Sequence, residues 1–281
     1  MMSLAPYRWC TSSNGLCFSA LSLMAIGHMV AGGRARFKRC PEDNCLLIFS
    51  CIQAVTRPDP ELLTRPMTQR QSVRAYLPTP VPDALLRHIL TQARRAPSSC
   101  NLQPGAFLSI QGEARQRLSS RLIDAWRTGQ PEGEDYSYFP EPLPMTLRRR
   151  QVAAAQALYG ALGVDRADRG GRDAQFERNF RFFDAPVALL VTIQREFGSG
   201  GYMDLGMAVY GLMLAAQSHG LATCAIGAIA SYPKLVRDSL DLETHSAIVC
   251  GLALGYADVS APVNQAHTTR CELDDYFRVI T

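Results

Sequence analysis

Residues 70–74 read Arg-Gln-Ser-Val-Arg, and residues 96–104 read Ala-Pro-Ser-Ser-Cys-Asn-Leu-Gln-Pro. In the first motif, Arg70 and Arg74 flank Ser72. A guanidinium can hold two phosphate oxygens at once, and a hydroxyl can add a short hydrogen bond. The first motif therefore predicts an anion site. The alternative is the polar start of an ordinary surface helix.

The second motif is predicted to be a rigid polar loop. It holds two serines, an asparagine and a glutamine between two prolines. Hydroxyl and amide side chains bind polyols and the edges of heterocycles, and the prolines restrict the backbone that presents them. The motif therefore indicates a ligand contact. An asparagine-containing surface turn is the alternative.

A helix is predicted between the two motifs. It begins at Val81-Pro82-Asp83, and apolar residues then recur at helical spacing. Arg94 and Arg95 follow at its C-terminal end, where positive charge interacts favourably with the helix dipole. The predicted apolar face consists of Leu85, Leu86, Ile89, Leu90 and Ala93.

The rest of the chain alternates strands with helices, which predicts an α+β fold with a mixed sheet of four or five strands flanked by helices. The predicted strands are 106–110, 185–193, one within 220–228, and 246–256. The predicted helices are 59–69 interrupted by Pro66, 113–126, one opened by Arg148, Arg149 and Arg150 with Val152, Ala155, Leu158 and Leu162 on its apolar face, 203–218, and 232–240.

Composition limits the classes of function that the chain can have. The 281 residues are 47% hydrophobic and 19% charged, enough for one sizeable core. The net charge of +4 suits an anionic ligand but lacks the basic stripe of a nucleic-acid binder. The nine cysteines form no paired framework, so we expect a reduced, cytoplasmic protein.

Residues 1–57 are predicted to be a poorly ordered N-terminal extension, followed by a domain at residues 58–281. The apolar stretch 16–32 is short and interrupted, unlike a membrane span, and positive charge follows it, unlike a signal peptide. A membrane tether through this stretch is the alternative. Cys40, Cys45 and Cys51 lack the paired spacing of a zinc site, so no metal is expected.

The segment 130–147 is a candidate active-site loop. It is polar, rich in proline, and carries the aromatic residues Tyr136, Tyr138 and Phe139. Its length exceeds that of a simple turn, and long loops in compact domains are often functional. The alternative is a packed excursion of the chain that contacts no ligand.

Several motifs of catalysis are missing from the sequence. No Gly-x-Gly-x-x-Gly follows a predicted strand, and the chain has neither a phosphate-binding Walker motif nor Gly-x-Ser-x-Gly. We call Arg70, Ser72 and Arg74 the phosphate clamp. A chain with such a clamp but without a motif for a protein nucleophile fits an enzyme in which a cofactor carries the chemistry.

The two motifs, in this order and with Pro80-Val81-Pro82 between them, resemble the opening of the nitroreductase family. This family consists of FMN-dependent NAD(P)H oxidoreductases, and the likeness is greatest to its nitrobenzoate-reductase-like branch. The resemblance runs from about Asp59 to the C-terminus. Gly105 departs from it, because many members carry an aromatic residue there. Gly227 also departs, because some relatives carry an acidic residue.

The resemblance implies the roles of individual residues. Arg70 and Arg270 would hold the FMN phosphate with Ser72 beside them, near Asn264, and Arg74 would face the N1/O2 edge of the flavin. Residues from the second motif would come from the other subunit, and the backbone N–H groups of Gly227 and Ala228 would face N5 and O4. The implied cofactor-binding residues are Arg70, Gln71, Ser72, Arg74, Pro97, Ser98, Ser99, Asn101, Gln103, Gly227, Ala228 and Arg270. The implied substrate pocket consists of Tyr138, Phe139, Phe182 and Phe183, although a dense aromatic patch such as 179–183 is more often core.

The implied protein is a homodimer centred on the apolar helix 203–218, with FMN at the subunit interface. NADH or NADPH would reduce the cofactor, and a small aromatic acceptor, a nitroaromatic above all, would then take two electrons. Two alternatives remain: another acceptor such as a quinone, an enone or a halogenated aromatic, and a protein that binds FMN without turnover. Neither a nucleic-acid partner nor a membrane is expected.

Overall fold

The main domain is built on a four-stranded antiparallel sheet in the order β3-β4-β6-β5. The computed structural model describes residues 11–12, 15–16, 60–130 and 132–281. The strands of this sheet are β3 Ala106–Ile110, β4 Val187–Gln194, β5 Ala222–Ile226 and β6 Ser246–Gly255. Because β4 lies between two neighbours and is covered on both faces, its unbroken apolar run is almost wholly buried.

The chain divides into two units, residues 1–58 and 59–281. In the first, β1 (Thr11–Ser12) pairs antiparallel with β2 (Gly15–Leu16). The rest of the predicted extension, residues 1–57, lies outside the described residues, together with its cysteines at 40, 45 and 51 and most of the stretch 16–32. None of the described helices is long and apolar enough to cross a membrane.

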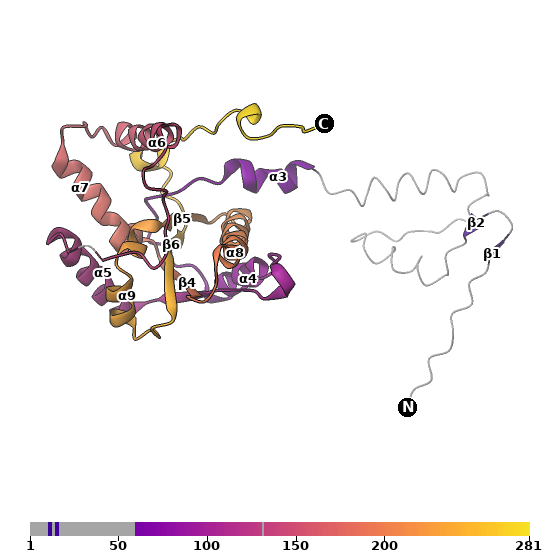
Figure 1. Cartoon of the computed structure of the whole chain (residues 1–281), viewed down its shortest axis with the longest axis horizontal. Coiled ribbons are helices and arrows are strands. Elements are labelled where there is room, and N and C mark those ends of the chain that lie inside the picture. Colours follow the sequence, from indigo (N-terminus) through magenta and orange to yellow (C-terminus); the bar gives the residue numbers. More distant parts are fainter. Residues whose placement is uncertain (1–10, 13–14, 17–59, 131) are drawn as a thin grey trace. The chain divides into compact units, whose positions relative to one another are not determined.

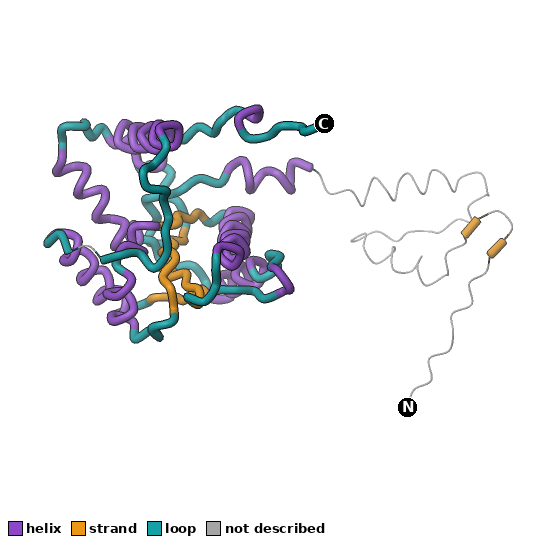
Figure 2. The backbone as a smooth tube through the Cα atoms, in the orientation of Figure 1, coloured by secondary structure: helices purple, strands orange, loops and turns teal. Residues whose placement is uncertain are grey.

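Helices cover both faces of the sheet, as Figures 1 and 2 show. On one face, α4 (Asp83–Ala93) and α8 (Ser199–Ser218) pack on Leu189, Leu252 and Leu254. The opposite face is covered by α5 (Gly112–Arg127), α9 (Pro233–Leu240) and the 3₁₀ segment η3 (Arg178–Asp184). The expected α+β fold with a sheet between helices is confirmed. The only parallel pairing among the described residues is a bridge between Ser72 and Thr223.

The predicted helix faces agree with the packing in α4 and α5. In α4, Leu86, Ile89 and Ala93 are buried, with Leu85 and Leu90 packed beside them. In α5, Leu118 and Leu122 are fully buried, with Ile123 and Trp126 packed against the same core. The remaining elements are α3 Pro60–Gln69, η2 Ser99–Asn101, α6 Met145–Leu162, α7 Arg169–Glu177, η4 Gly227–Ser231, η5 Pro262–Gln265 and η6 Leu273–Asp275.

The break expected at Pro66 is wrong, because α3 runs through this residue to Gln69. Proline removes one backbone donor from the ladder of a helix, but it leaves its own carbonyl free to accept. That carbonyl accepts a hydrogen bond from the Arg70 N–H at 3.1 Å. The helix therefore ends at Gln69, directly before the Arg-Gln-Ser-Val-Arg motif.

The apolar face expected for the helix opened by Arg148, Arg149 and Arg150 is not buried. The helix, α6, begins earlier, at Met145, and none of its residues is buried within this chain. Val152 is 49% exposed. The helix is exposed because it lies at the edge of the domain, where it packs on η5 rather than on the sheet (Figure 1).

Phe182 and Phe183 lie in the core rather than in an open pocket. Their exposed fractions are 0% and 1%, and both belong to the cluster between the sheet and α5. Both have a positive φ of 53°, which turns the chain sharply before β4 and directs the two rings inward. We therefore leave both residues out of the substrate pocket that the resemblance implied.

Candidate functional site

The Arg-Gln-Ser-Val-Arg motif forms an extended segment against β5. The Val73 N–H donates to the Thr223 carbonyl at 3.2 Å, and Ser72 bridges the same residue. The Val73 side chain is 2% exposed. Since side chains alternate along an extended chain, the burial of Val73 directs Ser72 and Arg74 to the other side.

This segment lines a cavity of about 820 Å³ together with the C-terminal tail. Arg70 and Arg270, far apart in the sequence, lie on its wall, as the anion-site hypothesis requires. The lining residues are Met67, Thr68, Gln69, Arg70, Gln71, Ser72, Arg74, Tyr210, Ala266, His267, Thr268 and Arg270. Tyr210, His267 and Thr268 were not predicted, because nothing local in the sequence connects them to the motif.

The cavity carries positive charge without a counter-ion. No carboxylate lines it, and Arg70, Arg74 and Arg270 form no ion pair within residues 60–130 and 132–281. Arg74 Nη1 donates to the Ser72 carbonyl at 3.2 Å, and Arg270 Nη1 donates to Thr268 Oγ1 at 3.0 Å. The guanidiniums are thus held by neutral acceptors, and their charge remains available to a dianionic phosphate. The donor set fits the phosphate of FMN.

Asn264 fastens the tail to the clamp segment. Its side chain is 5% exposed, and its Oδ1 accepts from the Arg74 N–H at 2.8 Å. Its Nδ2 donates to the carbonyls of Ala75 and Asp258, each at 2.8 Å. Gln71 Nε2 donates to the Asn264 carbonyl at 3.3 Å. Asn264 therefore fixes the backbone of the clamp through these hydrogen bonds, before the chain reaches Arg270.

Cys224 lies beneath the clamp on β5 and is 2% exposed. Burial raises the pKa of its thiol, and the charges of Arg74 and Arg70 and a hydrogen bond with Ser72 oppose that rise. The thiol therefore stays neutral at physiological pH. It places no negative charge under the arginines, so their field toward the cavity is not cancelled from below.

The second motif forms a tight turn whose conformation is fixed by its own hydrogen bonds. The Gln103 N–H donates to Ser98 Oγ at 2.9 Å, and Gln103 Nε2 donates to the Asn101 carbonyl at 3.0 Å. Cys100, Asn101 and Gln103 all have a positive φ. Such a cluster of left-handed, non-glycine residues is strained and is found mostly at functional sites.

Asp204 of α8 anchors this turn. It is 6% exposed, and its Oδ2 accepts the Ser99 N–H at 2.9 Å. With Pro97, Ser98 and Gln103 it lines a second cavity of about 330 Å³. Sequence reasoning missed Asp204, although an acid in an otherwise apolar helix was the signal that could have shown it. The two motifs thus line different cavities of the same chain.

Gly105 stands at the wall of the second cavity, and its surroundings explain the departure from an aromatic residue. Its φ is +88°, which favours glycine, and an added Cβ would lie 2.7 Å from Leu205 Cδ1 and 2.8 Å from the Thr192 carbonyl oxygen. A side chain at this position would therefore clash with both α8 and β4.

Gly227 and Ala228 begin η4 at the end of β5. Gly227 is exposed, and no atom lies within 4 Å of a Cβ built on it, so its backbone is open to a flat ring. Ala228 is half-buried and packs on the core. Neither residue lines the two cavities described above.

Tyr138 and Phe139 form an exposed aromatic pair. Their exposed fractions are 59% and 52%, and their ring centroids are 4.7 Å apart. The Tyr136 ring lies 6.0 Å from that of Tyr138 and 5.0 Å from that of Tyr202 on α8. An aromatic row thus runs from α8 to the tip of the loop. This arrangement presents a flat apolar surface to solvent.

Comparison with known proteins identifies the family. The model of the nitroreductase family matches residues 67–256. This chain belongs to the nitroreductase family. It is 39% identical to chloronitrobenzene nitroreductase of Comamonas testosteroni over 74% of this chain and 92% of the relative. It is 37% identical to 4-nitrobenzoate reductase of Pseudomonas putida, over 73% of this chain and 89% of the relative. The resemblance to the nitrobenzoate-reductase-like branch is therefore confirmed.

A solved structure agrees with this assignment. The nitroreductase NfnB of Sphingopyxis sp. strain HMH, described as FMN and NADPH-dependent, matches with a TM-score of 0.75 and 35% identity. The match covers 78% of this chain and 98% of the solved chain. The nitroreductase fold of the present chain therefore extends over nearly the whole length of that enzyme.

Proposed function

We propose that this nitroreductase-family chain is an FMN-dependent NAD(P)H oxidoreductase that reduces nitroaromatic compounds. The observation that carries the proposal is the cavity where Arg70 and Arg270 meet without a counter-ion. The relatives support it, because they include enzymes named for chloronitrobenzene and 4-nitrobenzoate. The similar solved structure is described as dependent on FMN and NADPH.

The residues of the cavity would contact different parts of FMN. Arg70 and Arg270 would hold the phosphate of FMN, and Ser72 would donate to a phosphate or ribityl oxygen. Arg74 would lie near the pyrimidine edge of the ring, where its charge would favour the reduced form. The bound cofactor would supply the redox chemistry, a two-electron transfer from NADH or NADPH to the acceptor. The chain itself supplies no nucleophile, and its catalytic contribution is binding and electrostatics.

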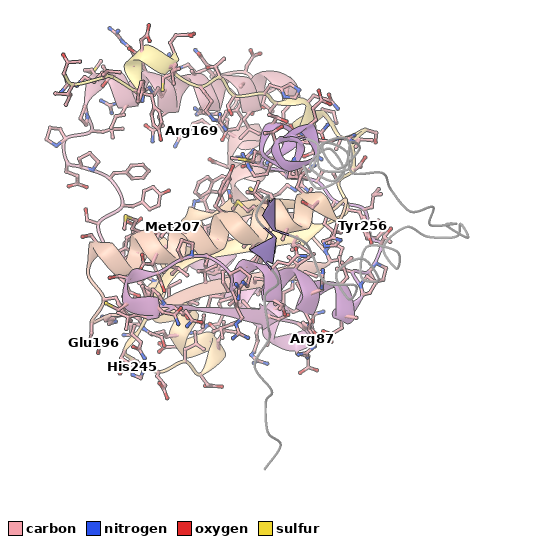
Figure 3. All side chains as sticks on the ribbon, turned by 90° about the vertical axis from the view of Figure 1, so that its right-hand side faces the viewer. Arg87, Arg169, Glu196, Met207, His245 and Tyr256 are labelled. Atoms are coloured by element: carbon pink, nitrogen blue, oxygen red, sulfur yellow. The ribbon has the colours of Figure 1, made fainter. Side chains whose placement is uncertain are left out.

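We propose a homodimer with FMN at the subunit interface. The α8 residues Met203, Gly206, Met207 and Tyr210 form an exposed stripe at helical spacing, and Met203 is 66% exposed. Figure 3 views the side of the domain on which α8 lies and labels Met207 there. Since the two motifs line different cavities of one chain, a second copy can bring its own Pro97, Ser98, Ser99 and Asn101 to the Arg70 cavity.

The acceptor would stack on the aromatic surface of the loop. Tyr138 and Phe139 are exposed and offer ring faces to a flat, electron-poor substrate. A small aromatic acceptor suits this surface better than a nucleic acid or a membrane. We further propose a cytoplasmic location, because the described cysteines, including the exposed Cys100, are all free thiols.

The first test is a visible spectrum of the purified chain before and after the addition of NADPH without oxygen. The expected result is bound flavin that bleaches with NADPH or NADH and recovers its colour with 4-nitrobenzoate. A protein that stays colourless after incubation with FMN refutes the proposal. Flavin that binds but never bleaches would indicate a binding protein, and recovery with quinones alone would indicate a quinone reductase.

The assignment of the clamp is tested by Arg70→Ala. A charge-assisted contact with phosphate contributes about 1.5–3 kcal/mol, so the affinity for FMN should fall roughly ten- to a hundredfold. Arg87→Ala is the matched control, because Arg87 pairs with Asp83 on the exposed face of α4 and lines neither cavity. Equal FMN affinity in the two variants, measured by fluorescence titration, would contradict the assignment.

A further inference from the structure

The loop that carries Tyr138 is fixed at its base by two carboxylates, those of Glu132 and Asp135. Glu132 accepts the Lys234 N–H at 2.7 Å and thereby caps the N-terminus of α9. Asp135, whose side chain is 4% exposed, forms ion pairs with Arg195 and Arg237. Its Oδ2 also accepts the Ile248 N–H at 2.9 Å. The base of the loop is thus tied both to α9 and to β6.

The second tie is at an irregularity of β6. Cys250 pairs with Val191 and Ile248 pairs with Thr192, so the intervening Val249 has no partner on β4. The neighbouring strand β5 does not reach it either, because its pairing with β6 begins at Gly251. The carbonyl of Val249 instead accepts the Tyr136 hydroxyl at 2.8 Å. Two consecutive side chains, Asp135 and Tyr136, therefore replace the strand pairing that β6 lacks at this point.

Tyr136 remains a donor throughout the working pH range. Burial is the main cause that raises the pKa of its hydroxyl well above the ordinary value of 10.0. The proton needed for the hydrogen bond to Val249 is therefore retained. The ring of the same residue contacts Tyr138 on one side and Tyr202 of α8 on the other. One side chain thus connects the sheet, α8 and the aromatic pair.

We propose that Tyr136 is the positioning residue of the acceptor site: its bond to the bulge at Val249 fixes the base from which Tyr138 is presented to the substrate. This inference rests on the proposed function, because Tyr138 matters for acceptors only if the chain reduces them. Because the base of the loop is fixed and its tip is exposed, the aromatic surface of Tyr138 and Phe139 would have a defined position when the acceptor binds. Loss of the hydroxyl would leave the ring but remove the tie of the loop to Val249.

The test is Tyr136→Phe, which removes only the hydroxyl. Loss of one hydrogen bond to a half-buried carbonyl should increase local opening on the order of tenfold. Amide hydrogen exchange of the Ile248 N–H, which donates to Asp135 Oδ2 at the base of the loop, should accelerate by that factor in the holoenzyme. In steady-state assays with 4-nitrobenzoate, the KM of the acceptor should rise on the order of tenfold, with kcat, the rate of reduction by NADPH and the FMN content unchanged.

Tyr256→Phe is the matched control. Tyr256 follows β6 at its other end, away from Glu196 and the adjacent Arg195 (Figure 3), and no hydrogen bond of its hydroxyl is present among the described residues. This variant should change neither the exchange nor the KM. Glu132→Gln loosens the other tie of the loop and should increase the same exchange, which gives a second perturbation independent of the aromatic ring.

Each outcome has one meaning. Unchanged exchange in Tyr136→Phe overturns the anchoring, and accelerated exchange with an unchanged KM overturns the positioning role. A loss of FMN, or an equal effect in Tyr256→Phe, would show a general structural defect and would also overturn the proposal. If the unmodified protein binds no FMN or is not bleached by NADPH, the proposed function fails first and the positioning role falls with it. The exchange data still report separately on the anchor.

Discussion

Replacement of Asn264 by alanine should both destabilise the domain and weaken FMN binding. The side chain accepts the Arg74 N–H and donates to the carbonyls of Ala75 and Asp258, all at 2.8 Å, in a site that is 5% exposed. After the substitution the Arg74 N–H has no other hydrogen-bond partner among the described residues. The two carbonyls still accept from the N–H groups of Asp258 and Ala261.

These differences set the magnitude of the effect. An orphaned donor costs about 1–3 kcal/mol, and each bond lost from a carbonyl that keeps another donor costs about 0.5–1.5 kcal/mol. Because losses within one network are not additive, we expect the free energy of unfolding to fall by about 2–4 kcal/mol. The affinity for FMN should fall as well, because Asn264 fixes the backbone of Arg74.

Urea unfolding measured by circular dichroism checks the first effect, and FMN titration checks the second. Gln265→Ala is the control, because Gln265 is exposed and its side chain makes one hydrogen bond, to the Val259 carbonyl. The Gln265→Ala substitution should lower the free energy of unfolding by no more than about 1 kcal/mol. If Asn264→Ala were no more destabilising than Gln265→Ala, the view that Asn264 fastens the clamp would be refuted.

Two further predictions concern the sheet and its neighbours. Gly105→Ala forces a Cβ to 2.7 Å from Leu205 Cδ1 at a φ of +88°, so Tm should fall by roughly 5–15 °C in calorimetry, whereas Gly133→Ala, with open space around it, should have little effect. Burial raises the pKa of Cys250 from 9.0 to about 12, so the unfolded thiol ionises first and the free energy of unfolding should fall as pH rises through this interval. Cys250→Ala should remove up to about 1.4 kcal/mol per pH unit from that slope in urea titrations, and identical slopes would contradict the assignment.

The regular elements could be predicted from the sequence because local patterns determine them. The apolar run of β4 is short and rich in Val and Leu, which is typical of a buried strand. The stripe of α4 likewise follows from helical spacing. At Pro66 the local rule failed, because α3 continues through the proline to Gln69.

The candidate site depended on information that no local pattern carries. The meeting of Arg70 with Arg270 came from the resemblance to a family, and the structure supports it through one shared cavity. Asp204 could not be assigned to the turn at Ser99 without the packing of α8 against it. The burial of Phe182 was not evident from the sequence, because its backbone has a positive φ, a conformation that sequence patterns do not indicate in a phenylalanine.

The crowding at Gly105 restricts the mutational routes open to this protein. The aromatic residue expected from the resemblance cannot be introduced there alone, since Leu205 and the backbone of Thr192 already occupy the space. Replacement of Leu205 by a smaller residue would remove only one of the two clashes, because the carbonyl oxygen of Thr192 would remain. Residues 105 and 205 must therefore change together with a shift of β4, so single exchanges between relatives will meet strong epistasis at this position.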